Sequence, residues 1–128
     1  MAVTIRKHRE PAEGILVCGS PYFADRDVIQ ETLQERVGKG SIVYTFRLGG
    51  ACHITEIWAR SRHVLCYALP LPDSIPKRQA LILELVSVAD EVVLFGGEDD
   101  AVTRYMFRLA KLAKRTVYCI GFVKIPES

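Results

Sequence analysis

The sequence predicts an α/β protein: a Rossmann-like three-layer sandwich built on a five-stranded parallel sheet in the order 3-2-1-4-5. Five short apolar runs alternate along the chain with segments in which apolar residues recur every three or four positions. Glycine or proline interrupts the chain between most of them. Strands that alternate with helices in this way pair in parallel through right-handed crossovers, with helices on both faces.

The five predicted strands cover residues 14–19, 42–46, 63–69, 91–95 and 116–120. The first is a continuous apolar run, which is typical of a parallel strand buried on both faces. Cys18, Cys66 and Cys119 fall within predicted strands. We expect these three to be core residues, because a buried thiol behaves as a small hydrophobe.

Four helices are predicted between the strands. The first begins at a capping Asp25 or Asp27 and runs to about Val37. Gly38 and Gly40 are expected to end it. The others cover residues 51–61, residues 77–89 with Pro76 at or near the first turn, and the apolar stripe between residues 102 and 113.

The predicted helix at residues 77–89 has an unusually wide apolar face. The face spans an arc of about 160° at 100° per residue. A face this wide indicates a second contact beyond the sheet, and a homodimer interface is the simplest candidate. The residues on this face are Leu81, Ile82, Leu85, Val86, Val88 and Ala89.

The bulk composition fits one compact domain. A chain of 128 residues that is 49% hydrophobic can bury a core of its own. We assign residues 14–121 to a single Rossmann-like domain, residues 1–13 to an irregular lead-in and residues 122–128 to a tail.

The charge does not favour a polyanionic partner. The net charge is only +2, so neither nucleic acid nor a membrane surface is indicated. The densest basic cluster, residues 6–9, is interpreted as part of a solvated tail, with a nucleic-acid arm as the alternative. No apolar run is long enough to span a bilayer, and the N-terminus lacks the apolar core of a signal peptide, so a cytoplasmic protein is expected.

Three loops carry small residues where a strand passes into a helix: Gly19-Ser20, Gly49-Gly50-Ala51 and Gly96-Gly97. In the strand order 3-2-1-4-5, the turns after the first and fourth strands lie side by side. Such glycines could serve only to permit tight turns. Three of them at carboxyl ends of strands nevertheless favour a ligand the size of a phosphate or nucleotide.

The sequence lacks the motifs of several common sites. It has neither Gly-x-Gly-x-x-Gly after the first strand nor a Walker A motif, so NAD binding and ATP hydrolysis are not indicated. The four cysteines include no Cys-x-x-Cys pair, so neither a zinc knuckle nor a dithiol redox motif is present. No cofactor and no metal ion are expected.

Four short motifs resemble the SLOG superfamily, and most closely its YspA-like branch, which is related to the LOG enzymes and the DprA Rossmann domain. They are G-S-P-Y-F-A-D at 19–25, G-G-A-C-H-I-T at 49–55, P-K-R-Q-A-L-I at 76–82 and A-D-E-V-V-L-F-G-G at 89–97. The resemblance covers about residues 14–121. It implies a Rossmann-like fold that binds a nucleotide or nucleotide-derived ligand in the crevice between the loops.

The chain departs from the pattern of that branch in each loop. Pro21 stands where an arginine is usual, although Phe23 and Asp25 fit. His53 and Thr55 stand where a glycine and an aspartate are usual, and Gln79 replaces an asparagine. By this resemblance the ligand-binding residues are Gly19, Ser20, Phe23, Gly49, Gly50, Ala51, His53, Arg78, Gly96, Gly97, Asp99 and Asp100.

The resemblance does not extend to a catalytic residue. The LOG phosphoribohydrolases carry a catalytic glutamate in the fourth loop, and this chain has Thr103 at that position. Without a carboxylate, no evident group protonates or stabilises a departing base. We therefore assign no catalytic residue.

The acidic run Glu98-Asp99-Asp100 has two interpretations. Acids in the first turn of a helix are favoured by the helix dipole, which makes capping the simpler one. The functional one is that they bind ribose hydroxyls or a divalent cation, because like charge disfavours phosphate there. Phosphate would then lie nearer Ser20, the glycines at 49–50 and Arg78.

Cys52-His53 at a helix N-terminus resembles an activated cysteine nucleophile. Adjacent helical residues point about 100° apart, so His53 as a hydrogen-bond donor to a ligand is the better functional hypothesis.

The leading hypothesis is a module without an intact catalytic motif that binds a nucleotide-like small molecule. The alternatives are a hydrolase that cleaves an N-glycosidic or phosphate-ester bond of a nucleotide, and a structural or interaction protein that acts as a homodimer.

Overall fold

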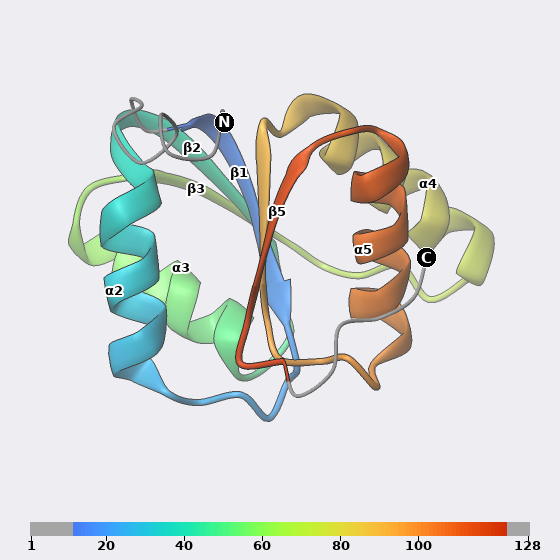
Figure 1. Ribbon diagram of the computed structural model, residues 1–128, viewed down its shortest axis with the longest axis horizontal. Helices are drawn as coiled ribbons and strands as arrows, with labels where there is room; N and C mark the ends of the chain where they lie inside the picture. The colour runs from blue at the N-terminus through green and yellow to red at the C-terminus, as the bar shows by residue number, and fades with distance from the viewer. Residues whose placement is uncertain (1–11, 123–128) are drawn as a thin grey trace, which may run out of the picture.

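A computed structural model describes residues 12–122 as an open α/β sandwich (Figure 1). Five strands alternate with four helices in the described part of the chain. The elements are β1 (Ala12–Gly19), α2 (Arg26–Arg36), β2 (Val37–Phe46), α3 (Ala51–Ser61), β3 (Leu65–Leu69), α4 (Ile75–Val88), β4 (Glu91–Phe95), α5 (Ala101–Leu112) and β5 (Thr116–Ile120).

The sheet has the predicted order, β3-β2-β1-β4-β5, and every pair of neighbours is parallel. β1 is the central strand, with β4 beside it in a register that pairs Leu16 with Val92 and Gly19 with Phe95. All five residues of β4 are buried, as expected for an inner strand covered on both faces. The fold class predicted from the sequence is therefore confirmed.

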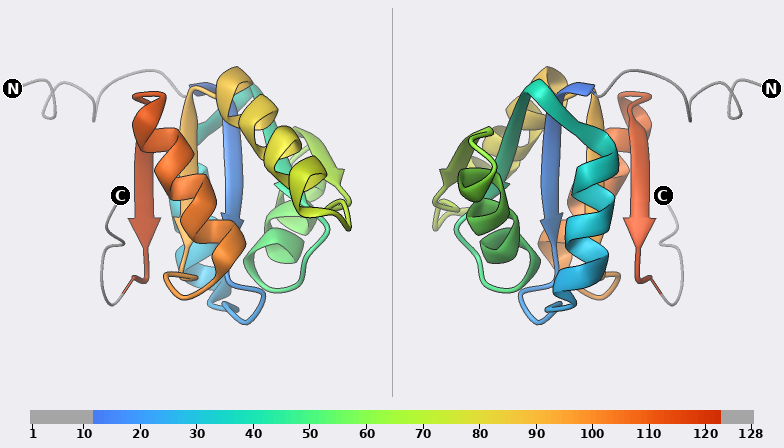
Figure 2. Two further views of the ribbon diagram at one scale, coloured as in Figure 1. Left: turned by 90° about the vertical axis from the view of Figure 1, so that its right-hand side faces the viewer. Right: turned by 90° about the vertical axis from the view of Figure 1, so that its left-hand side faces the viewer.

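Helices cover both faces of the sheet, as Figure 2 shows from its two sides. α2 and α3 cover one face, where Ile29, Leu33 and Trp58 pack with Ile15 and Val93. α4 and α5 cover the other face, where a second cluster contains Leu16, Ile82, Val86, Val92 and Met106. Neither face of the central strands is left to solvent.

The wide apolar face of α4 has its second contact within the same chain. Ile82, Leu85 and Val86 belong to the same buried cluster as Met106 and Phe107 of α5. α4 therefore packs on α5 as well as on the sheet, and these contacts account for much of the face. Leu83 and Val88 remain 55% and 52% exposed.

The start of β2 differs from the prediction. α2 ends at Arg36, and Val37 already has extended backbone angles. Gly38 and Gly40 lie inside β2 and do not terminate the helix, because β2 already pairs with β1 at Val37 and pairs with it again from Ile42. The third strand is also shorter than predicted, because residues 63 and 64, which were assigned to the strand, instead close helix α3. His63 has the left-handed φ of 58°, and the Val64 amide donates to the Ala59 carbonyl over 2.9 Å.

The helix starts follow the sequence signals closely. The Asp25 side chain accepts from the Val28 amide and caps α2. Ser74 caps α4 in the same way, which starts that helix two residues earlier than predicted and leaves Pro76 in its first turn.

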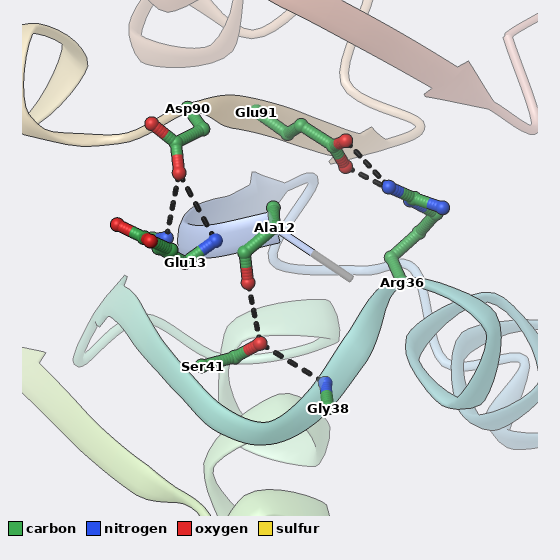
Figure 3. A network of polar contacts seen from close by, with 8 residues as sticks. Ala12, Glu13, Arg36, Gly38, Ser41, Asp90 and Glu91 are labelled. Carbon is green, nitrogen blue, oxygen red and sulfur yellow. Dashed lines mark hydrogen bonds and ion pairs between the residues drawn. The ribbon is translucent and has the colours of Figure 1, made fainter. Parts of the chain in front are cut away.

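A polar network fixes the amino end of the sheet (Figure 3). Arg36 Nε and Nη2 donate to the two carboxylate oxygens of Glu91 over 2.9 and 2.5 Å. One oxygen of Asp90 accepts from the backbone amides of Glu13 and Gly14. The Ser41 hydroxyl donates to the Ala12 carbonyl, so these contacts join α2, β1, β2 and the start of β4 at the amino end of the sheet.

The cysteines are only partly core residues. Cys18 is buried as predicted, and Cys52 is buried too. Cys66 and Cys119 are half-buried, because they lie on the two edge strands β3 and β5. None of the helices between residues 12 and 122 is long and apolar enough to cross a membrane.

Candidate functional site

The candidate site is a crevice at the carboxyl ends of β1 and β4, where the strand order reverses. The Ser20 amide donates to the Phe95 carbonyl over 3.0 Å, which holds the two loops together. The predicted adjacency of these loops is therefore present. The crevice has a volume of about 330 Å³ and is lined by Ser20, Pro21, Tyr22, Gly97, Glu98, Asp99 and Asp100.

Two glycines allow the three loops to meet. Gly97 has a φ of 85°, and a Cβ there would lie 2.8 Å from Thr103 Oγ1 and 3.0 Å from the Ser20 amide. Gly50 has a φ of 62°, and a Cβ there would lie 2.4 Å from the Pro21 carbonyl oxygen. Both positions require glycine for backbone angle and for space. Their first role is to pack the loops against one another.

The carboxylate of Asp100 is engaged in helix capping. Its Oδ2 accepts from the Thr103 amide over 2.9 Å and from the Thr103 hydroxyl over 3.0 Å. The capping interpretation is thus confirmed for Asp100. Asp99 is exposed and Glu98 is partly buried on the same wall. No lysine or arginine is among the lining residues, so this wall of the crevice is acidic.

Thr103 lies beneath the fourth loop. Its side chain is fully buried, and its hydroxyl donates to Asp100. A side chain here does not reach the open crevice. Thr103 therefore serves to hold the loop in this chain.

The start of α3 differs from the other helix starts in residues 12–122. Its N-cap is Gly50, which provides no side-chain hydrogen bond, whereas Asp25, Ser74 and Asp100 cap the other three helices. The first backbone N–H groups of an uncapped helix and the positive end of its dipole are suited to an anion. Since Gly50 touches Pro21, this helix start adjoins the crevice.

The residues around that helix start differ in accessibility. The side chains of Ala51 and Cys52 are buried, so only their backbone could meet a ligand. His53 is exposed and is not among the residues that line the crevice. Cys52 and His53 therefore share no common surface of the kind that a nucleophile and its base require.

Of the twelve predicted binding residues, four line the crevice: Ser20, Gly97, Asp99 and Asp100. Phe23 and Arg78 are among the eight that do not. The Phe23 ring packs with its centroid 5.7 Å from that of Phe95 and lies over Gly96, so it covers the ends of β4 and β5. Arg78 donates from Nε to the Pro72 carbonyl over 2.6 Å, which fastens the proline-rich loop. Its side chain lines a separate groove between α4 and α5, together with Tyr105 and Arg108.

The sequence did not single out Tyr22, which stands on the rim of the crevice. Its side chain is 91% exposed, and its amide donates to the Ser20 hydroxyl over 3.0 Å. An exposed aromatic ring on a loop fixed by such a turn is a suitable stacking surface for a planar ligand. The sequence signal that could have identified it is an aromatic residue between Pro21 and Phe23.

Two buried thiols lie just below the crevice, and the sequence did not indicate that they meet. Cys18 and Cys52 approach to 3.7 Å between their sulfur atoms. The hydrogen bond with Cys18 lowers the pKa of Cys52 to about 7, against the opposing effect of burial. The same hydrogen bond, together with burial, raises the pKa of Cys18 well above its usual value.

Comparison of the sequence with models of protein families found no match, and comparison with curated proteins found none. The class of protein is therefore defined by the fold and the place of the crevice: an open Rossmann-like sandwich with a crevice at its topological switch point. Among residues 12–122, no group of three or more His, Cys, Asp and Glu side chains is placed to hold a metal ion.

Proposed function

We propose that the protein binds a nucleotide or nucleotide-derived ligand in this crevice, as a SLOG-like module without an intact catalytic motif. The observation that carries the proposal is a cavity of about 330 Å³ between the loops that follow β1 and β4. This is the position at which open parallel sheets bind their ligands.

The size and charge of the crevice suggest how such a ligand would lie. Its volume is at the low end of the roughly 300–1,000 Å³ of ligand pockets, which suits a nucleoside better than a whole dinucleotide. Carboxylates accept hydrogen bonds from ribose hydroxyls, and Asp99 is free to do so on the acidic wall. The base would stack on Tyr22.

The phosphate would lie away from the acidic wall. Like charges repel, so Glu98 and Asp99 disfavour a phosphate at the start of α5. The start of α3 carries no side-chain cap, and its N–H groups favour negative charge. We therefore place the phosphate beside Gly50, with the nucleoside between Tyr22 and Asp99.

Isothermal titration calorimetry with adenosine, AMP, ADP-ribose and cyclic nucleotides tests this proposal. Tyr22→Ala should weaken binding by about 1–3 kcal/mol, the usual contribution of one stacked base. Leu112→Ala is the matched control, because Leu112 is also highly exposed but lies at the far end of α5. The absence of heat for every ligand at millimolar concentration would contradict the proposal.

Asp99→Asn tests the ribose contact separately. It should weaken adenosine and AMP alike, because both carry the ribose, while Asp73→Asn should change neither. Asp73 is an exposed acid outside the crevice lining, which makes it the matched control. Equal effects of the two substitutions would indicate only a long-range charge effect.

A nucleotide hydrolase remains the alternative. No carboxylate replaces the missing acid at Thr103, and Asp100 is occupied by its hydrogen bonds to that residue. We therefore expect no base or phosphate release from labelled nucleoside monophosphates. Release that Asp99→Asn abolishes would favour the hydrolase instead.

We also propose, from fewer observations, that the protein forms a homodimer through α4 in the cytoplasm. Leu83 and Val88 are the exposed apolar residues in the second half of α4. They are five positions apart, which places them about 140° apart around the helix. Light scattering of the full chain at increasing concentration tests the dimer, and a Leu83→Glu/Val88→Glu variant should remain monomeric.

A further inference from the structure

The pair Cys18 and Cys52 is the feature from which we draw a further inference. Cys18 is the next-to-last residue of β1, and Cys52 is the second residue of α3. Their sulfur atoms lie 3.7 Å apart, and both side chains are fully buried. The sequence separation of 34 residues means that the fold alone brings them together.

Several neighbouring groups shift the pKa values of the two thiols in opposite directions. The Cys18 thiol lowers the pKa of Cys52 to about 7, and the Thr45 hydroxyl and nearby backbone amides act in the same direction. The pKa of Cys18 is raised by its hydrogen bond to Cys52, then by burial, and slightly by the Asp100 carboxylate. When the pair loses one proton, Cys52 becomes the thiolate and Cys18 keeps its S–H.

We propose that Cys18 and Cys52 are a site of reversible oxidation and form a disulfide beneath the crevice, with a small hydroperoxide as the oxidant. The proposal is independent of any nucleotide ligand, because it depends only on the two sulfurs and their surroundings. Contact between two thiols at the end of a strand and the start of a helix is its basis.

The chemistry balances in two steps. The Cys52 thiolate attacks one oxygen of the hydroperoxide, the O–O bond breaks, and the leaving alkoxide or hydroxide takes up a proton. Cys18 then attacks the sulfur of the Cys52 sulfenic acid. The S–O bond breaks, the S–S bond forms, and the Cys18 proton leaves with the hydroxide as water. Two thiols lose two electrons, and the hydroperoxide is reduced to an alcohol or water.

The other two cysteines are not competitors for this reaction. Cys66 and Cys119 lie on opposite edges of the sheet, so they cannot reach each other. Burial raises the pKa of both thiols, which lowers their thiolate fraction at neutral pH. They are more accessible than the buried pair, yet less reactive toward a peroxide.

Access to the pair and the effect of its oxidation both involve the start of α3. The first turn of that helix has no side-chain cap, unlike the other three helix starts in residues 12–122, so its opening breaks no capping hydrogen bond. Forming the bond brings the sulfurs from 3.7 Å to about 2.05 Å. Gly50 is already packed against Pro21, so this movement is transmitted to the loop that carries Tyr22.

Treatment of the reduced full chain with hydrogen peroxide tests the proposal. Thiol titration in guanidinium should fall from the four thiols of the chain to two, and dithiothreitol should restore all four. The intact mass should fall by about 2 Da, the loss of two hydrogens. Tryptic mapping without reduction should join the peptides at residues 10–26 and 48–60, which contain Cys18 and Cys52.

A Cys66→Ser/Cys119→Ser variant is the principal control, because it keeps only the buried pair. It should form the same disulfide at the same rate. In the Cys18→Ser variant, oxidation should stop at the Cys52 sulfenic acid, which a dimedone probe captures. If that variant does not fold, disulfide formation in the Cys66→Ser/Cys119→Ser variant still tests the proposal. Persistence of both thiols of the double variant after prolonged peroxide treatment overturns the proposal, as does oxidation confined to Cys66 and Cys119 in the unmodified chain.

Discussion

Removal of one partner from the buried ion pair between Arg36 and Glu91 should strongly destabilise the fold. The two residues are only 8% and 3% exposed, and two parallel hydrogen bonds join them. Glu91→Leu removes the carboxylate and leaves a buried guanidinium without that partner. The pKa of Arg36 is raised mainly by its hydrogen bond to Glu91, which indicates how strongly the charged form depends on it.

The expected magnitude follows from the asymmetry of buried pairs. Removal of one partner costs about 3–5 kcal/mol, because the remaining charge is left uncompensated. Replacement of both partners by apolar side chains is often neutral. Glu91→Leu and Arg36→Met should therefore each destabilise the protein by about 3–5 kcal/mol. The Arg36→Met/Glu91→Leu double variant should lie within about 1 kcal/mol of the unmodified chain.

Urea denaturation followed by circular dichroism measures these differences. With a slope near 2 kcal/mol per molar urea, the single variants should lose about 1.5–2.5 M in midpoint. Glu56→Leu is the matched control, because Glu56 pairs with Arg60 on the surface of α3 with a shortest N–O distance of 2.7 Å. An i,i+4 surface pair contributes only about 0.3–0.5 kcal/mol, so its midpoint should change little.

A midpoint shift by Glu91→Leu no larger than that by Glu56→Leu would contradict this expectation. A double variant as unstable as the sum of the two singles would contradict it too, because the sites would then be energetically independent.

Three further predictions concern the carboxyl end of the sheet. Gly97→Ala should destabilise the protein by at least the roughly 1–2 kcal/mol of a left-handed alanine, because its Cβ would also lie 2.8 Å from Thr103 Oγ1. Gly40→Ala, with no atom within 4 Å of its Cβ, should stay within about 0.5 kcal/mol in the same thermal melt. Asp100→Ala should cost about 1 kcal/mol through loss of the α5 cap, and an unchanged melting temperature would refute that role. The peroxide reaction of Cys52 should rise with pH, because a pKa of about 7 makes the thiolate the major form only above that pH. The expected gain is about tenfold between pH 6 and 8 with a plateau above, whereas a gain near 75-fold without a plateau would indicate an ordinary thiol.

The arrangement of the sheet could be predicted from local patterns. β4 reads as an uninterrupted apolar run after Glu91, and an inner parallel strand requires that run because both of its faces are covered. The helix starts carry their own capping residues, such as Asp25. Together with the strand order, these patterns were sufficient to place the crevice between the loops after β1 and β4.

The differences arose where a long-range contact overrides a local signal. Gly38 and Gly40 resemble a helix stop, yet the pairing of Val37 with Ala12 draws this segment into β2. The Nε of Arg78, which was predicted to bind the ligand, donates to the Pro72 carbonyl six residues earlier, a contact that the sequence did not indicate.

Parts of the candidate site depended on geometry that no sequence spacing encodes. The exposure of Tyr22 follows from the turn closed by the Ser20 hydroxyl. Cys18 and Cys52 meet because the end of a strand lies against the start of a helix. The sequence excluded adjacent cysteine motifs, but it could not reveal a pair formed across the fold.

The length of strand β4 separates the buried ion pair from the candidate site. Glu91 at its first residue belongs to the buried ion pair, and the carbonyl of Phe95 at its last residue accepts from the Ser20 amide beside the crevice. At about 3.3 Å per residue, these two positions are about 13 Å apart. Substitutions at sites this far apart add without interference. An engineer can therefore strengthen the amino end first and use the stabilised scaffold to tolerate larger changes in the loops that line the crevice.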